Sequence, residues 1–173
     1  ESEIEYCRKN IVENYRFKKV KQIVAGGEER YHSVYAGLQG ITNGSYVYIH
    51  DGARPFISQA DLLKLKAAVE KEQACVAAMP VKDTIKQSNV NQYVESTPPR
   101  NLLWAIQTPQ VFSYDLVFDA YDRLMQEKIE GVTDDAMVVE TMTDHPVKLV
   151  ETSYRNIKIT TPEDLELAKL YLK

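Results

Sequence analysis

The chain has 173 residues, of which 44% are hydrophobic and 27% are charged, a balance that is ordinary for a globular domain with a substantial core. Its net charge of −4 argues against binding to nucleic acid through phosphate neutralisation, although a few local cations suffice for a small phosphorylated ligand. No apolar run approaches the roughly 18 residues that a membrane-spanning helix needs. We therefore expect one domain over residues 1–173, with neither nucleic acid nor membrane as a partner.

The first part of the chain alternates predicted helices and strands. Residues 1–15 place apolar side chains on one helical face, which predicts an amphipathic helix. Because the chain begins inside a helix, with glutamate and not methionine, we expect a fragment that lacks an upstream segment. A strand over 20–27, a helix over 30–39 and a strand over 46–50 are predicted to follow.

The middle of the chain contains a buried strand and a polar hairpin. Ser58 and Asp61 have the spacing of a capping box and predict a helix start. Residues 74–81 form a wholly apolar run, as expected of a strand buried on both faces. Residues 82–100 are polar, alternating and rich in turn residues, which predicts a β-hairpin that stands off the core.

The last third returns to the core with further strands and helices. We predict strands over 102–112, 146–151 and 157–160, and helices over 113–128, 133–141 and from Thr161, where Pro162 and Asp164 complete the start signal. Alternating helices and apolar strands predict an α/β sandwich with a mostly parallel sheet. Ligands of such sheets bind at the carboxyl ends of the strands.

Cysteines and histidines show none of the spacings that carry common chemistry. Cys7 and Cys75 lie in segments with apolar periodicity, so we interpret them as small core residues of a protein in a reducing, cytoplasmic environment. The three histidines form no zinc-type spacing with them and no readable partnership with a serine. The sequence thus predicts neither a disulfide framework nor a zinc site nor a hydrolytic triad.

Five polar clusters come next to predicted strands. They are GGEERYHS (26–33), HDGARP (50–55), PVKDT (80–84), QTPQ (107–110) and RNIKIT (155–160). Each alone fits ordinary turn and cap chemistry. Together, at one edge of a sheet, they favour a ligand site, because caps alone do not require Arg54 and Lys158 there.

Three of these clusters suit a phosphorylated ligand. Gly26-Gly27 before a helix exposes backbone N–H groups that fit a phosphate or the edge of a base. Asp51 at a strand end fits either a Mg²⁺ ligand or a turn cap. Lys158 between apolar neighbours either extends along the surface to water or points at a ligand phosphate, and we favour the phosphate.

Six motifs, taken in order, resemble the 2-C-methyl-D-erythritol 4-phosphate cytidylyltransferase family: VAGGEERYHSVYAGL, HDGARPF, PVKDTIK, LLWAIQTPQVF, GVTDDA and RNIKITTPEDL. The resemblance runs from about residue 20 to the C-terminus. It implies a three-layer α/β/α sandwich with a Rossmann-like sheet, of the nucleotide-diphospho-sugar transferase type, and a protruding β-arm. It also implies Mg²⁺-dependent transfer of CMP from CTP to methylerythritol 4-phosphate, with release of pyrophosphate, in the non-mevalonate isoprenoid pathway.

The resemblance also implies roles for individual residues. The nucleotide would contact Gly27, Glu28, Ser33, Asp51, Gly52, Ala53 and Lys158, with Asp51 holding Mg²⁺. The sugar phosphate would contact Arg54, Thr84, Arg100, Thr108 and Thr133. Lys158, Asp51 and Arg54 would be the catalytic residues. The hairpin at 82–100 would be a dimerisation arm that carries Thr84 and Arg100 to the substrate of a second subunit.

Two alternatives stay open at this stage. Ribitol-5-phosphate cytidylyltransferases share HD-x-x-RPF, QTPQ and NIKITTP, whereas PVKDT and LWA favour the methylerythritol family. Glu28 stands where the family commonly has aspartate. The family begins with a strand and a glycine-rich loop that cradles the CTP phosphates, and residues 1–20 contain no counterpart. We therefore expect residues 1–173 alone to form no CDP-linked product, and a non-catalytic remnant that binds partners or sugar phosphate is the second alternative.

Overall fold

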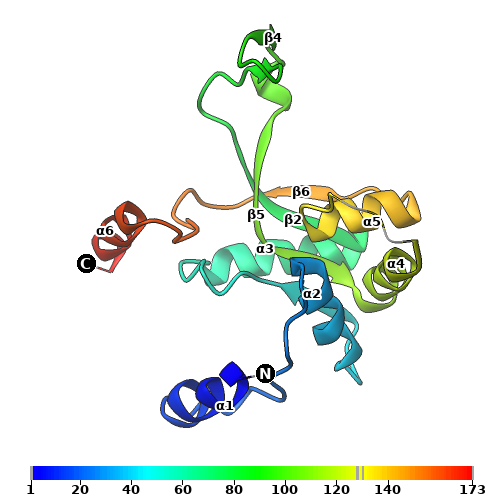
Figure 1. Ribbon diagram of the computed structural model, residues 1–173, viewed down its shortest axis with the longest axis vertical. Coiled ribbons are helices and arrows are strands. Elements are labelled where there is room, and N and C mark those ends of the chain that lie inside the picture. The colour runs from blue at the N-terminus through cyan, green and yellow to red at the C-terminus, as the bar shows by residue number, and fades with distance from the viewer. Residues whose placement is uncertain (1, 128, 130, 173) are drawn as a thin grey trace. The chain divides into compact units, whose positions relative to one another are not determined.

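The computed structural model describes residues 2–127, 129 and 131–172 (Figure 1). The chain forms two compact units, each made of two stretches of sequence. The first unit contains Glu1–Ser45 and Tyr114–Thr143, and the second contains Tyr46–Ser113 and Asp144–Lys173. Among the described residues, no helix is long and apolar enough to cross a membrane.

The second unit is built on a four-stranded sheet with the order β1-β5-β2-β6. The strands are β1 (Tyr46–Ile49), β2 (Ala74–Pro80), β5 (Trp104–Ser113) and β6 (Lys148–Glu151). Strand β5 runs antiparallel to both β1 and β2, while β2 and β6 are parallel. Three strands therefore point in one direction and β5 opposes them. The predicted α/β class is confirmed, with β5 as the exception to the parallel arrangement.

Strand β2 lies at the centre of the core. Its residues from Ala74 to Met79 are all buried, as predicted for a strand covered on both faces. Helix α3 (Gln59–Glu72) packs against it through Leu65 and Val69, which are both fully buried. Cys75 belongs to the same cluster, and burial raises the pKa of its thiol to about 12. Cys7, the other free cysteine, is only half-buried.

Side chains cap both of the predicted helix starts and replace missing backbone partners. The Ser58 hydroxyl accepts a hydrogen bond from the Asp61 N–H at 3.0 Å and begins α3. Helix α6 (Pro162–Tyr171) begins in the same way, because Thr161 Oγ1 accepts from the Asp164 N–H. These bonds satisfy N–H groups that have no partner inside the helix. The two predictions of helix starts are confirmed.

The first unit is helical. It contains α1 (Ser2–Cys7), which continues as a π-helix at Arg8–Glu13, then α2 (Arg30–Gln39), α4 (Tyr114–Glu127) and α5 (Asp135–Thr143). Helix α4 packs against α2 and α5. Its buried residues recur every three or four positions, which is the pattern of one apolar helical face: Val117, Ala120, Tyr121 and Leu124.

Two predicted strands are wrong. Residues 20–27 form no strand, because the segment is almost entirely exposed, with only Ile23 half-buried, and ends in two glycines. Residues 157–160 also form no strand. There the Ile159 N–H donates to the Ala53 carbonyl and the Thr160 N–H donates to the Asp164 side chain. These N–H groups are therefore not available for hydrogen bonds to a neighbouring strand.

The QTPQ motif lies inside β5, as the strand predicted over 102–112 implies, and not beside a strand end. The pairing with β2 shifts register there, so that Gln107 to Pro109 form a bulge, and the Thr108–Pro109 peptide bond is cis. The opening helix ends at Glu13, two residues before the predicted end of its apolar face.

Residues 82–100 form the predicted hairpin, which stands off the sheet of the second unit (Figure 1). Strands β3 (Gln87–Ser88) and β4 (Val94–Ser96) pair antiparallel. The Asn89 side chain closes the turn by accepting from the N–H groups of Asn91 and Tyr93. Tyr93 is 73% exposed, so the hairpin presents apolar surface to solvent.

Candidate functional site

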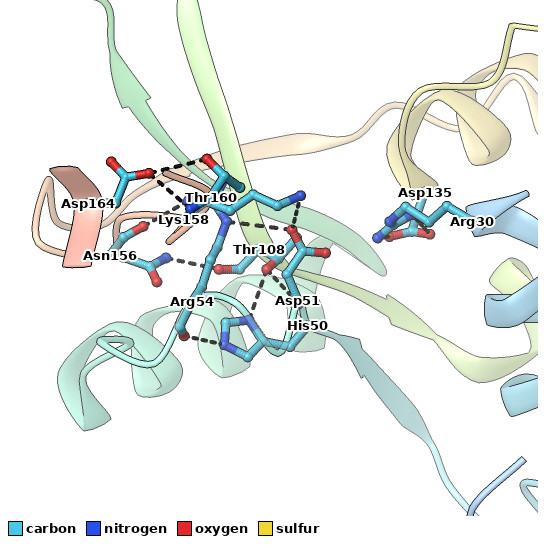
Figure 2. A network of polar contacts seen from close by, with 10 residues as sticks. All are labelled: Arg30, His50, Asp51, Arg54, Thr108, Asp135, Asn156, Lys158, Thr160 and Asp164. Atoms are coloured by element: carbon cyan, nitrogen blue, oxygen red, sulfur yellow. Dashed lines mark hydrogen bonds and ion pairs between the residues drawn. The ribbon is translucent and has the colours of Figure 1, made fainter. Parts of the chain in front are cut away.

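A turn at the end of β1 carries an ionic cluster. The Arg54 N–H donates to the Asp51 carbonyl at 3.0 Å and closes the turn. The Asp51 carboxylate lies 3.0 Å from Lys158 Nζ and 3.8 Å from Arg54 Nε (Figure 2). The Lys158 side chain is 46% exposed, against 13% for Arg54. Burial lowers the pKa of Arg54, and the Asp51 carboxylate opposes this effect.

Thr108 and His50 fix the turn to β5. Thr108 Oγ1 accepts from the Asp51 N–H at 3.0 Å and lies 2.9 Å from His50 Nδ1. His50 Nε2 lies 2.9 Å from the carbonyl oxygen of Arg54. A carbonyl only accepts, so Nε2 carries a proton. In the neutral ring Nδ1 then accepts, and the Thr108 hydroxyl donates to it. One threonine therefore orients both the Asp51 backbone and the His50 ring.

In the first unit, the predicted base-binding residues surround the start of α2. The Gly27 N–H donates to Ser33 Oγ at 3.0 Å, and Glu28 lies exposed beside them. A Cβ atom at Gly27 would lie 2.3 Å from the Cβ of His32, so this close approach requires glycine. Glu29 caps the helix, because its side chain accepts from the His32 N–H.

A second ionic cluster in the first unit joins α2, α4 and α5. Arg30 donates two hydrogen bonds of 2.7 Å to the carboxylate of Asp135, which is fully buried. The Tyr121 hydroxyl donates to the same carboxylate at 2.5 Å. Thr133 lies just before α5, where its hydroxyl contacts Met137 Sδ at 3.6 Å. The sequence assigned no role to Arg30, Tyr121 or Asp135.

The structure brings the predicted residues together in groups. Asp51, Arg54, Thr108 and Lys158 meet in the second unit, with Gly52 and Ala53 in the same turn. Gly27, Glu28 and Ser33 form a group in the first unit, and Thr133 precedes α5 there. Thr84 and Arg100 are exposed near the two ends of the hairpin, where Arg100 Nη1 donates to the Lys82 carbonyl.

Three residues of the Asp51 cluster were not predicted to act there: His50, Gln107 and Asn156. Each stands inside a motif that we singled out, namely HDGARP, QTPQ and RNIKIT. Their contacts join positions that lie far apart in sequence, since His50 meets Thr108 and Asn156 meets Gln107. The only signal available in the sequence was their place inside those motifs.

A magnesium ion fits this site only together with phosphates. Among the residues that the structure describes, no group of three or more His, Cys, Asp or Glu could hold a metal. Asp51 supplies one carboxylate, and Mg²⁺ typically uses one or two carboxylates with phosphate oxygens and water. The donor set therefore suits a metal that arrives bound to a nucleotide.

An apolar groove lies beside His50, between β1 and α3. It has a volume of about 470 Å³ and is lined by Tyr48, His50, Ile57, Gln59, Leu62, Leu63, Lys66 and Pro109. This mainly apolar lining does not suit a triphosphate or a sugar phosphate. The charged side chains that could meet such a ligand lie in the ionic cluster and not in this groove.

Known proteins similar to this chain share one description. A family model described as 2-C-methyl-D-erythritol 4-phosphate cytidylyltransferase matches residues 4–173. Curated proteins of that name from Lachnospira eligens and Alkaliphilus oremlandii are 53% and 52% identical to it. The alignments cover 98% and 99% of this chain, and 75% and 72% of those relatives.

Solved structures agree with the sequence relatives. The 4-diphosphocytidyl-2C-methyl-D-erythritol synthase of Anaerococcus prevotii superposes with a TM-score of 0.87 at 36% identity, covering 97% of this chain and 74% of that one. The 2-C-methyl-D-erythritol 4-phosphate cytidylyltransferase of Thermus thermophilus gives 0.77 at 30% identity, covering 89% and 77%. This chain belongs to the 2-C-methyl-D-erythritol 4-phosphate cytidylyltransferase family.

Proposed function

We propose that this protein transfers CMP from CTP to 2-C-methyl-D-erythritol 4-phosphate, giving CDP-methylerythritol and pyrophosphate. The observation that carries the proposal is the ionic cluster of Asp51 and Lys158, seen in a chain of this family. The names of the relatives favour methylerythritol phosphate over the ribitol phosphate considered from the sequence.

The chemistry of this reaction matches the residue types in the cluster. A phosphate oxygen of the sugar phosphate, already ionised at neutral pH, attacks the α-phosphorus of CTP. The bond from that phosphorus to the bridging oxygen breaks, and pyrophosphate leaves with the electron pair. The nucleophile needs no general base, so catalysis rests on in-line positioning and on positive charge around the phosphates. A site of Lys, Arg, Thr and Asp provides these two elements.

Each residue then has a stated role in the proposal. Lys158 donates to a non-bridging oxygen of the α-phosphate, where negative charge develops, and its partial exposure supports this role. Asp51 would hold Mg²⁺, which supplies further positive charge to the phosphates when bound. Arg54 and Thr108 would orient the sugar phosphate.

The base of CTP would bind in the first unit. Gly27, Glu28 and Ser33 would recognise cytosine, and Gly52 and Ala53 would lie beside the ribose. The hydrogen bond from the Gly27 N–H to Ser33 Oγ supports the proposal, because it fixes the loop before α2. A rigid loop presents its remaining polar groups to a base at a low entropic cost.

We further propose a homodimer in the cytoplasm, formed through the arm at residues 82–100, which would carry Thr84 and Arg100 to the neighbouring site. An isolated two-stranded hairpin is marginal in water and gains from a partner surface. Val90, Tyr93 and Val94 on this arm are 97%, 73% and 61% exposed. Deletion of the arm should yield monomers by light scattering, and a wild-type monomer at micromolar concentration would contradict the dimer.

The proposed function is tested with Asp51→Asn in the protein as its gene encodes it. We expect Mg²⁺–CTP to bind about tenfold more weakly or worse, because a neutral amide is a poor ligand for a hard cation. Asp119→Asn is the matched control, since Asp119 also pairs with an arginine but lies on an exposed helix surface.

The assay is pyrophosphate release from CTP with methylerythritol 4-phosphate or ribitol 5-phosphate as acceptor. Faster turnover of ribitol 5-phosphate would overturn the proposed substrate. Unchanged nucleotide binding in Asp51→Asn, with the fold intact, would remove Asp51 from the site.

A further inference from the structure

Lys158 lies on an irregular segment, and yet its ammonium group is held 3.0 Å from Asp51. Residues 152–160 form neither helix nor strand. Such a segment has no ladder of backbone hydrogen bonds to fix it. Asn156, two residues before Lys158, is the one residue in this segment that is classed as buried, and it is fully so.

The side chain of Asn156 anchors the segment to β5. Its Nδ2 donates to Gln107 Oε1 and to the Thr108 carbonyl, both at 2.9 Å. Gln107 in turn accepts from Thr152 Oγ1 at 3.1 Å and donates to the Ser153 carbonyl at 3.3 Å. Two side-chain amides therefore connect the bulge of β5 with the segment on the N-terminal side of Lys158.

The backbone of the same segment is tied to the turn after β1. The Asn156 carbonyl accepts from Arg54 Nη1 at 2.8 Å (Figure 2). The Ile159 N–H donates to the Ala53 carbonyl, also at 2.8 Å. Lys158 lies between these two attachment points, so the position of its Cα follows from them.

Two buried side-chain atoms in this network, Arg54 Nε and Asn156 Oδ1, lack a hydrogen-bond partner. No other buried side-chain nitrogen or oxygen in the described part of the chain shares this condition. An unsatisfied buried polar atom destabilises the folded state. A polar network that is retained despite this loss of stability is typical of a functional site. In a core selected for stability alone, apolar side chains would replace the polar ones.

We infer that Asn156 is a positioning residue of the cytidylyl transfer, with Gln107 as its partner, an inference that rests on the proposed function. Asn156 fixes the backbone on the N-terminal side of Lys158, while the Ile159–Ala53 hydrogen bond holds the other side. The ammonium group then stays beside Asp51 and meets the α-phosphate of the nucleotide. Asn156 itself contacts no substrate and acts through Lys158.

The test is a double-mutant cycle with Asn156→Ala, Lys158→Ala and the double variant, followed by pyrophosphate release. Asn156→Ala should lower kcat about 10- to 100-fold, the usual range for a residue that orients a functional group. KM for CTP should change less than kcat, because the weakened contact is that of Lys158 with the α-phosphate, which is strongest in the transition state. The double variant should be no slower than Lys158→Ala, since Asn156 has nothing to position once the ammonium group is gone.

Asn10→Ala is the matched control, because Asn10 Nδ2 also donates to a backbone carbonyl, that of Tyr6, but on an exposed helix. It should keep wild-type kcat. If Asn156→Ala fails to fold, Gln107→Ala and Gln107→Glu replace it. Glutamate retains the oxygen that accepts from Asn156, so Gln107→Glu should retain more activity than Gln107→Ala.

Wild-type kcat in Asn156→Ala, or losses that simply multiply in the double variant, would overturn the inference. Hydrogen exchange separates this failure from failure of the proposed function. The Ile159 amide should exchange at least tenfold faster in Asn156→Ala, whether or not the protein turns over CTP. Unchanged exchange at Ile159 would refute the positioning role. A wild-type protein, as its gene encodes it, that releases no pyrophosphate would refute the proposed function, and the exchange rate would then still test whether Asn156 anchors the Lys158 segment.

Discussion

Two aspartates of this protein, Asp135 and Asp51, each face an arginine, but their surroundings differ. Asp135 is fully buried and receives two hydrogen bonds of 2.7 Å from Arg30 and one of 2.5 Å from Tyr121. The Asp51 side chain is 17% exposed and lies 3.0 Å from Lys158 and 3.8 Å from Arg54. The first carboxylate has short, charge-assisted bonds, and the second has longer contacts with Arg54 and with the half-exposed Lys158.

The difference separates a structural ion pair from a site that exchanges partners. The buried Asp135 carboxylate is locked, because any movement would leave its charge unpaired in the interior, whereas its partner Arg30 is 38% exposed. Around Asp135, burial and the neighbouring carboxylate raise the pKa of Tyr121, which keeps the phenol protonated as a donor. Near Asp51, the ammonium of Lys158 is 46% exposed, so its proposed contact with a ligand phosphate would have a smaller desolvation cost.

The largest effect that would sharpen this comparison is expected from Asp135→Ala. The substitution leaves the Arg30 guanidinium and the Tyr121 hydroxyl without their carboxylate, so we expect the free energy of unfolding to fall by about 3–5 kcal/mol. Urea denaturation measures it. Asp119→Ala removes an exposed pair with Arg123 and should lose at most about 1 kcal/mol. Equal losses in the two variants would mean that the Asp135 pair is not structural.

Lys158→Met makes the opposite change in the second cluster. We expect kcat to fall about 100- to 1,000-fold, as when one preorganised donor to the transition state is removed. The midpoint of thermal unfolding should hardly move, because the Lys158 side chain is 46% exposed. Lys169→Met, which removes an exposed helical pair with Glu166, is the control for charge. A large loss of stability with normal kcat would mean that Lys158, like Arg30, has a structural role and not a catalytic one.

Asp164 is a third kind of carboxylate, one that caps a helix, and we expect its effect on stability to be the smallest of the three. Hydrogen bonds from the backbone N–H of Thr160, and then of Thr161, lower its pKa below the usual 3.8. The folded state therefore gains stability from Asp164 above pH 3.8, and this gain is lost as the pH falls through the lower, folded pKa. Amide exchange in α6 should accelerate over that acid range.

Asp164→Asn provides the check on this pH dependence. The variant should remove the acid-induced acceleration and leave α6 with weaker capping at neutral pH. An identical acid response of the variant and the wild type would assign the acceleration to another group.

Local signals carried the parts of the fold that the sequence predicted well. The apolar run of β2 and the helix caps at Ser58 and Thr161 each depend on residues close together in sequence. The direction of β5 did not follow from such signals, because strand composition is the same in either direction. The strand expected at 157–160 failed because its N–H groups bond to Ala53 and to the Asp164 side chain.

The candidate site also contains residues that local sequence signals indicated and residues that only contacts between distant positions reveal. Asp51, Arg54 and Lys158 were singled out because charges at strand ends need an explanation beyond turn chemistry. His50 and Asn156 were missed because their roles depend on contacts with Thr108. That residue lies more than forty positions from each of them in sequence, so nothing in the local sequence signals the contact. Residue types thus indicated the charged groups that the structure brings together, whereas the groups that hold them depend on the tertiary structure.

The pairing of β1 with β5, which comes much later in the sequence, also affects how the chain folds while it is being synthesised. Strand β1 is at the edge of the sheet, and its partner among the described strands is β5, with Ile49 opposite Gln110. During synthesis at about 5–20 residues per second, β1 would therefore wait several seconds for its partner to leave the ribosome. Until then its open edge is exposed to other chains, which is the condition under which nascent strands aggregate or recruit chaperones.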